Sequence, residues 1–132
     1  MTLVIDASVA AKWLFAEQGS QSARGLPGSH VLIAPDFILL EAHHVMWKRW
    51  RRRETEFAAA AGAMAAITAI LDACEPSYPL MEAARRISLA HDHAIYDCLY
   101  IALAERDDAE LVTADDKQFL VARKSRVKVR ML

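Results

Sequence analysis

Three short apolar runs, each leading into a helix-like pattern, constrain the fold of this chain more than any other feature. The runs are "TLVID" at 2–6, "HVLIA" at 30–34 and "ELVTA" at 110–114. Short continuous apolar runs fit strands that are buried on both faces. A last alternating run, "RVKVRML" at 126–132, predicts one more strand. Strands that alternate with helices predict an α/β fold, a three-layer α/β/α sandwich around a mainly parallel sheet.

Apolar residues at helical spacing fill the intervals between these runs. Turn-forming clusters, "GLPGS" at 25–29 and "EPSYPL" at 75–80, interrupt the pattern. Asp36 is expected to cap the second helix, and Thr55 to cap an alanine-rich one. The predicted helices cover 7–17, 37–53, 54–73, 81–90, 96–106 and 115–124.

Length and composition predict one globular domain over residues 1–132. The chain is 55% hydrophobic and 25% charged, with a net charge of −1, so composition alone gives no reason to expect nucleic-acid binding. Cys74 and Cys98 form no metal-binding or redox motif, and both are expected to be reduced thiols. The first residues lack signal-peptide features, and the alanine-rich run is too short for a membrane span. We therefore expect a cytoplasmic protein with no membrane association.

Carboxylates occupy the places where an α/β fold builds its ligand site. Asp6 ends the first apolar run, and Asp115 and Asp116 follow the third, so these acids should reach the same edge of the sheet. Glu41 and Asp97 lie on predicted helices with apolar neighbours. Each acid alone has a structural explanation as a helix cap or a dipole partner. Asp6 and Glu41 fit that explanation least, because a carboxylate in apolar surroundings loses hydration without compensation.

A neutralising cation would be required if four of these acids converge, namely Asp6, Glu41, Asp97 and one of the adjacent pair, Asp115 or Asp116. Crowded carboxylates repel one another, and a hard divalent ion relieves that repulsion. Oxygen ligands favour Mg²⁺ or Mn²⁺ over Zn²⁺. Such ions activate water and stabilise charge on a phosphoryl group, so the cluster predicts phosphodiester hydrolysis.

Four blocks of sequence, in this order and spacing, carry a family resemblance over nearly the whole chain. They are "LVIDASVAAKWLF", "APDFILLEAHHVMWKRWRRRE", "AIYDCLYIALAE" and "LVTADDKQF". The chain resembles the PIN-domain family, specifically the VapC-type ribonuclease toxins of prokaryotic toxin–antitoxin pairs. That resemblance implies a PIN-like fold and an Mg²⁺- or Mn²⁺-dependent RNA endonuclease. It also implies a homodimer that is held inactive by a cognate antitoxin.

The resemblance also assigns individual residues. The family's T-x-D pattern selects Asp115 rather than Asp116, which is left in a supporting position. His44 departs from the pattern, because relatives often carry a small polar residue such as Asn there. The implied catalytic and metal-binding acids are Asp6, Glu41, Asp97 and Asp115, with Ser8 and Thr113 as polar neighbours.

The basic run "KRWRRR" at 48–53 leaves two interpretations open. Its cations suit the C-terminal end of a solvated helix. They also suit contact with an RNA backbone or with an acidic antitoxin. The candidate contacts are Lys48, Arg49, Arg51 and Arg52.

Other metal-binding motifs and other functions have weaker support in the sequence than the acid cluster. Glu41 and His44 have an E-x-x-H spacing without the second copy that a di-iron bundle needs. The "HDH" at 91–93 is expected to be a solvated connection rather than a metal site. Two alternative functions remain: a receiver-like signalling domain with an acidic Mg²⁺ pocket, and a PIN-like binding module that has lost catalysis. The first lacks a convincing central aspartate and later lysine, and the presence of all four acids argues against the second.

Overall fold

Five short parallel strands form the central sheet, in the order β3-β2-β1-β4-β5. The computed structural model describes residues 1–132, except for the side chains of Phe57 and Ala60. The parallel pairing places the carboxyl ends of all five strands at one edge of the sheet. The strands are β1 (Thr2–Ile5), β2 (Val31–Pro35), β3 (Ala73–Glu75), β4 (Glu110–Thr113) and β5 (Val129–Met131).

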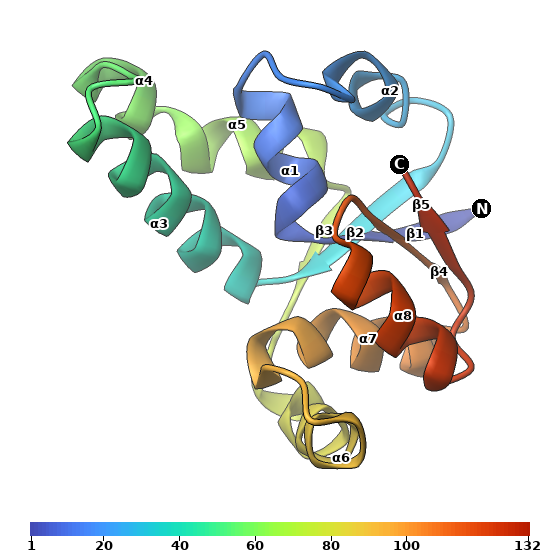
Figure 1. Ribbon diagram of the computed structural model, residues 1–132. Helices are drawn as coiled ribbons and strands as arrows, with labels where there is room; N and C mark the ends of the chain where they lie inside the picture. Colours follow the sequence, from blue (N-terminus) through green and yellow to red (C-terminus); the bar gives the residue numbers. More distant parts are fainter.

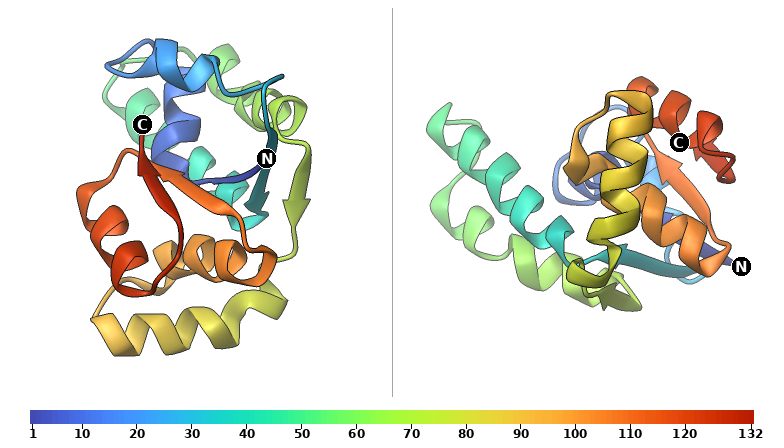
Figure 2. Two further views of the ribbon diagram at one scale, coloured as in Figure 1. Left: turned by 90° about the vertical axis from the view of Figure 1, so that its right-hand side faces the viewer. Right: turned by 90° about the horizontal axis from the view of Figure 1, so that it is seen from below.

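Helices cover both faces of this sheet, which confirms the predicted three-layer α/β/α arrangement. Helices α1 to α5 lie on one face and α6 to α8 on the other (Figures 1 and 2). This distribution follows from right-handed crossovers between parallel strands. The helices are α1 (Ala7–Leu14), α2 (Ser20–Arg24), α3 (Phe37–Arg51), α4 (Phe57–Ala61), α5 (Ala63–Ile70), α6 (Met81–His91), α7 (Ile95–Asp107) and α8 (Asp116–Lys124), with the 3₁₀ turn η1 (Tyr78–Leu80).

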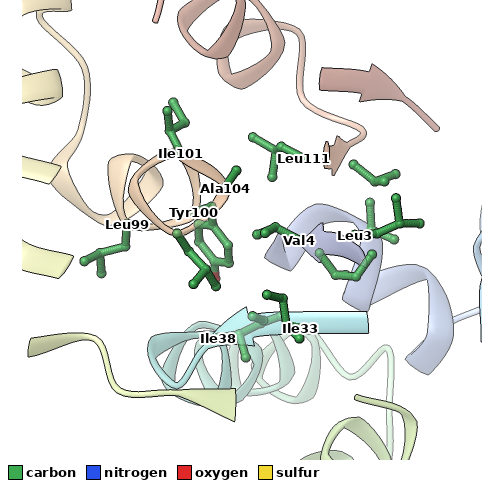
Figure 3. Packing of buried hydrophobic residues seen from close by; sticks show 14 of the residues in the cluster. Leu3, Val4, Ile33, Ile38, Leu99, Tyr100, Ile101, Ala104 and Leu111 are labelled. Atoms are coloured by element: carbon green, nitrogen blue, oxygen red, sulfur yellow. The ribbon is translucent and has the colours of Figure 1, made fainter. Parts of the chain in front are cut away.

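The core lies on both faces of the central strands, against α7 on one side and against α1, α3 and α5 on the other. Residues 3–5 of β1 are fully buried, as expected for a strand covered on both sides. Seven consecutive residues of α7, 98–104, are also buried, so the middle of this helix is covered on all sides. Figure 3 shows Tyr100 among Val4, Ile33 and Ile38, with its ring in the core. The helix that carries Asp97 is thereby fixed against the sheet.

The predicted alanine-rich helix over 54–73 is wrong in its extent. The structure divides it at Gly62 into α4 and α5, and α4 begins at Phe57, two residues after the expected cap Thr55. Glycine has a low helix propensity, and the break lets α4 and α5 pack separately along α3. Residues 73–75 form β3 instead of ending the helix. This three-residue strand has no local signal, because it forms by pairing with β2.

The start of α3 is fixed differently from the expected Asp36 cap. The Asp36 side chain makes no capping hydrogen bond to its own helix. Instead, Ser77 Oγ accepts a hydrogen bond from the Phe37 N–H at 3.1 Å and donates one to Asp36 Oδ1 at 2.6 Å. The cap therefore comes from the residue that precedes η1, and it ties the first turn of α3 to the segment that follows β3.

Among the described residues, no helix combines the length and apolarity needed to cross a membrane. The turn predicted at 25–29 is present, and the short α2 before it was not predicted.

Candidate active site

All four acids implied by the family resemblance line one cavity of about 130 Å³ at the carboxyl edge of the sheet. Asp6 follows β1, and Asp115 follows β4. Glu41 lies in the second turn of α3, and Asp97 in the first turn of α7. The full lining is Asp6, Ala7, Ser8, Glu41, Asp97, Tyr100, Asp115 and Gln118.

Asp6 is the most buried of the four carboxylates, with 5% of its surface exposed. It caps α1: its Oδ1 accepts hydrogen bonds from the backbone N–H groups of Ser8 at 3.1 Å and Val9 at 3.3 Å. The Ser8 hydroxyl donates a third at 2.5 Å. Burial raises the pKa of Asp6 to about 6, although these hydrogen bonds oppose the shift, and the nearby Asp97 charge adds to it.

Ser8 and Thr113 connect the two strand ends that carry acids. Ser8 Oγ accepts a hydrogen bond from the Ala114 N–H at 2.9 Å and lies 3.4 Å from Thr113 Oγ1. Thr113 is fully buried, and its Oγ1 accepts a hydrogen bond from the Asp115 N–H at 3.0 Å. The threonine of the T-x-D pattern thus positions the Asp115 backbone rather than its carboxylate.

The structure separates the adjacent acids Asp115 and Asp116. Asp115 is the N-cap of α8: its Oδ1 accepts a hydrogen bond from the Gln118 N–H at 2.9 Å, and the residue lines the cavity. Asp116 is the first residue of α8, is exposed, and does not line the cavity. Its position complements the helix dipole.

Glu41 is held by a residue that the sequence analysis missed. The Tyr100 hydroxyl donates a hydrogen bond to Glu41 Oε1. Burial raises the pKa of Glu41 to about 7, opposed by this hydrogen bond and reinforced by the Asp97 and Asp6 charges. Tyr100 stands three residues after Asp97, a spacing that places both on one side of a helix and could have indicated it.

Asp97 is held by His93 and Gln118, which sequence reasoning also missed. His93 Nε2 lies 3.2 Å from Asp97 Oδ2 and 3.2 Å from Gln118 Oε1. The Gln118 amide donates a hydrogen bond to the Asp97 carbonyl oxygen at 2.8 Å. Burial raises the pKa of Asp97, while the facing His93 opposes that shift. The expectation that the 91–93 segment is wholly solvated is therefore wrong for His93, because its ring packs against the start of α7.

The chemistry of this donor set fits a hard divalent cation. Three of the acids have raised pKa values with burial as the first cause, and each of the three also feels the charge of another of the four acids. A cation relieves both effects. Each carboxylate has a protein partner in this arrangement, and among the described side chains no three His, Cys, Asp or Glu groups stand together as a metal site.

The basic run at the end of α3 divides into two parts. Arg49 faces the α1–α2 connection: its Nη2 lies 2.6 Å from Glu17 Oε2, and its guanidinium stacks 3.8 Å from the centre of the Phe15 ring. The side chain is thus engaged within the domain, and the role of Arg49 as an RNA or antitoxin contact stays a prediction. Lys48, Arg51 and Arg52 line a surface groove.

His44 lies outside the acid cavity. It lines the same groove as the basic residues and stacks on Trp47, with 5.5 Å between ring centres. The E-x-x-H spacing therefore builds no metal site with Glu41 here. The histidine that stands here in place of the family's small polar residue therefore affects the surface beside the cavity, and not the acids that line the cavity.

A parallel α/β sheet with four carboxylates at its carboxyl edge is typical of proteins whose ligand site binds divalent metal ions. Such ions act on phosphoryl groups. A PIN domain family model matches residues 3–124, and the chain belongs to this family. It is 31% identical over 121 residues to ribonuclease VapC3 of Pyrobaculum aerophilum, covering 87% of this chain and 90% of the relative.

Two solved structures share the fold at low sequence identity. The first is the VapBC2 complex of Rickettsia felis, bound to a DNA fragment from its promoter, with a TM-score of 0.71 and 12% identity over 100% of this chain and 99% of that one. The second is VapC20 of Mycobacterium tuberculosis, a sarcin–ricin-loop-cleaving toxin, with a TM-score of 0.68 and 18% identity over 88% of this chain and 92% of that one.

Proposed function

We propose that this chain is a divalent-metal-dependent endoribonuclease that hydrolyses RNA phosphodiester bonds as the toxin of a toxin–antitoxin pair. The observation that carries the proposal is the convergence of Asp6, Glu41, Asp97 and Asp115 on one cavity. Membership of the PIN family and the ribonuclease relative support it. The family assignment also removes the receiver-like alternative. Residues 1–132 would act as a single domain.

The same four acids would hold the metal, and oxygen ligands of this kind favour Mg²⁺ or Mn²⁺. A bound cation would act as a Lewis acid that lowers the pKa of a water molecule and stabilises charge on the phosphoryl group.

Other residues of the chain hold the acids in place. Ser8 keeps the Asp6 carboxylate oriented through its hydroxyl, and Thr113 holds the backbone of Asp115. Tyr100 and His93 hold Glu41 and Asp97 at the rim. No side-chain nucleophile is required, because water is the attacking group.

Partners and location follow from the same proposal. An RNA substrate, a cognate antitoxin protein and a second copy of this chain are the expected partners, and the cytoplasm is the expected location. The VapBC2 structure supports the antitoxin assignment by analogy, because that relative is solved with its VapB partner on promoter DNA.

The test compares cleavage of single-stranded RNA by the purified protein in EDTA, in Mg²⁺ and in Mn²⁺. We expect cleavage only with a metal, and its loss in Asp6→Asn and Asp97→Asn. Both variants should keep the wild-type circular dichroism and melt at or above the wild-type temperature without metal, because asparagine replaces carboxyl groups whose ionised forms burial disfavours.

Asp116→Asn is the matched control and should stay active. Cleavage in EDTA, or full activity in both site variants, would contradict the proposed mechanism. Metal binding without cleavage of any RNA would indicate the inactive binding module instead.

A further inference from the structure

Three hollows on the surface adjoin one another along α3. The acid cavity shares Glu41 with an apolar groove of about 510 Å³. That groove shares His44 with a basic groove of about 380 Å³. The apolar groove is lined by Phe37, Leu40, Glu41, His44, Val45 and Tyr96, and the basic one by His44, Trp47, Lys48, Arg51 and Arg52.

The spacing of these residues explains why the hollows form a line. Phe37, Glu41, His44, Lys48 and Arg51 recur every three or four residues, which places them on one face of α3. The buried residues of the helix, Ile38, Ala42 and Met46, form the opposite face. Figure 1 shows α3 running from the carboxyl end of β2 away from the sheet. At 1.5 Å per residue, Lys48 stands roughly 10 Å along the axis from Glu41. We call this face, together with Tyr96, Trp47 and Arg52, the α3 stripe.

The part of the α3 stripe nearest to the acids is an exposed aromatic surface. Tyr96 stacks on Phe37 with 5.7 Å between ring centres and an interplanar angle of 7°, and Tyr96 remains 56% exposed. Tyr96 also immediately precedes Asp97 in the chain. A flat ring next to a phosphoryl site offers a stacking surface for a nucleobase, and every base can stack in this way.

The far part of the α3 stripe is positively charged, although the chain as a whole carries −1. Lys48, Arg51 and Arg52 form no ion pair among the side chains that the structure describes. Arg51 lies over the Trp47 ring at 5.3 Å from its centre, and Trp47 is 46% exposed. Unpaired cations interleaved with exposed rings are the features that bind the backbone and bases of single strands.

We infer that the α3 stripe binds single-stranded RNA: an unpaired base beside the cleaved bond stacks on Tyr96, and neighbouring phosphates lie against Lys48, Arg51 and Arg52. This inference rests on the proposed nuclease function. Charge complementarity and continuity with the acid cavity favour RNA as the occupant. A duplex cannot offer an unstacked base to Tyr96, so the stripe selects single-stranded substrate.

The experiment measures binding of a fluorescein-labelled, mixed-sequence single-stranded RNA by anisotropy in EDTA, and its cleavage with Mg²⁺. Tyr96→Ala should weaken binding and raise KM by roughly tenfold, whereas Tyr96→Phe should keep most of the affinity, because the ring does the stacking. Replacing Lys48, Arg51 or Arg52 by Gln should lower the salt slope of log K by about 0.7 for each phosphate that the protein no longer neutralises. Binding of a duplex of the same sequence should change little in Tyr96→Ala.

One matched control lies on α3 outside the stripe, and a second lies on α8. Trp50 is as exposed as Trp47 but lines neither groove, so Trp50→Ala should bind like the wild type while Trp47→Ala weakens binding. Lys124→Gln on α8 should keep the wild-type salt slope. The inference would be overturned if the wild type cleaves RNA and all stripe variants bind RNA as tightly as the wild type does. That result would assign the stripe to a protein partner and would leave the nuclease proposal standing. If the wild type shows no metal-dependent cleavage of RNA, the nuclease proposal itself would be overturned.

Discussion

Tyr100 of α7 donates a hydrogen bond to Glu41 of α3, and this contact joins the hydrophobic core to the acid cavity. The tyrosine is 1% exposed, and Figure 3 shows its ring among core side chains. Burial together with the Glu41 charge raises the pKa of Tyr100 well above its usual value, so the hydroxyl keeps its proton. The donor is therefore permanent, and the position of Glu41 depends on the packing of the core.

Removal of this hydroxyl should weaken metal binding at neutral pH. In Tyr100→Phe, Glu41 loses the hydrogen bond that stabilises its ionised form, so its pKa rises further from its ordinary value. The free energy of unfolding should fall by roughly 1–2 kcal/mol. The Mg²⁺ concentration for half-maximal cleavage should increase at neutral pH and return toward the wild-type value at alkaline pH. An equal increase at both pH values would contradict the pKa explanation.

The stability of the metal-free protein should fall as the pH rises. The pKa values of Asp6 and Glu41 go from 3.8 and 4.5 to about 6 and about 7 in the folded state. The native state therefore binds more protons than the unfolded state in this window, and its free energy of unfolding decreases with pH. Between pH of about 4 and about 7 the loss should be on the order of a few kcal/mol. Urea denaturation in EDTA across that range measures it.

Mg²⁺ should reverse this loss, because it binds ionised carboxylates of the native state. The rise in melting temperature on adding Mg²⁺ should be larger at pH 8 than at pH 5. The control is Glu41→Gln. In this variant the free energy of unfolding should lose the part of its pH dependence that comes from Glu41, and Mg²⁺ should raise the melting temperature much less. A melting temperature that rises with pH in EDTA would show that the acids are not desolvated as described.

Much of the fold was predictable because its signals are local. The strands β1, β2 and β4 are continuous apolar runs, and each leads into a helix, so their parallel pairing could be predicted, whereas the strand order β3-β2-β1-β4-β5 was not. Strand β3 and the break at Gly62 were not predictable in this way. Residues 73–75 become a strand only because β2 offers them a hydrogen-bonding edge.

The site shows the same division. Asp6 and Asp115 follow strands, so their meeting could be predicted from parallel topology alone. Tyr100, His93 and Gln118 have the pattern of ordinary core or connecting residues until α7 and α8 pack together. The Asp115-x-x-Gln118 spacing resembles a capping box, which could have drawn attention to Gln118, yet its side chain turns to the Asp97 carbonyl instead.

Arg49 should contribute to stability and not to RNA affinity. Its guanidinium contacts Glu17 and the Phe15 ring, and both charged side chains are partly buried. Arg49→Gln should therefore lower the free energy of unfolding by roughly 1 kcal/mol, because it removes the ion pair and the cation–π interaction. Its KM for RNA should match the wild type, in contrast to Arg51→Gln. An unchanged melting temperature with a raised KM would instead place Arg49 in the RNA-binding surface.

Asp115 and Asp116 should differ in function despite their adjacency. Asp115 lines the cavity and caps α8, whereas Asp116 is exposed on the first turn of that helix. Asp115→Asn keeps a good N-cap and removes only the charge, so it should lower metal-dependent cleavage by at least roughly tenfold with little change in stability. Asp116→Asn removes a charge that favours the helix N-terminus, so it should cost about 0.5 kcal/mol and leave cleavage unchanged. Equal loss of cleavage in the two variants, measured at saturating Mg²⁺, would show that both acids serve the metal.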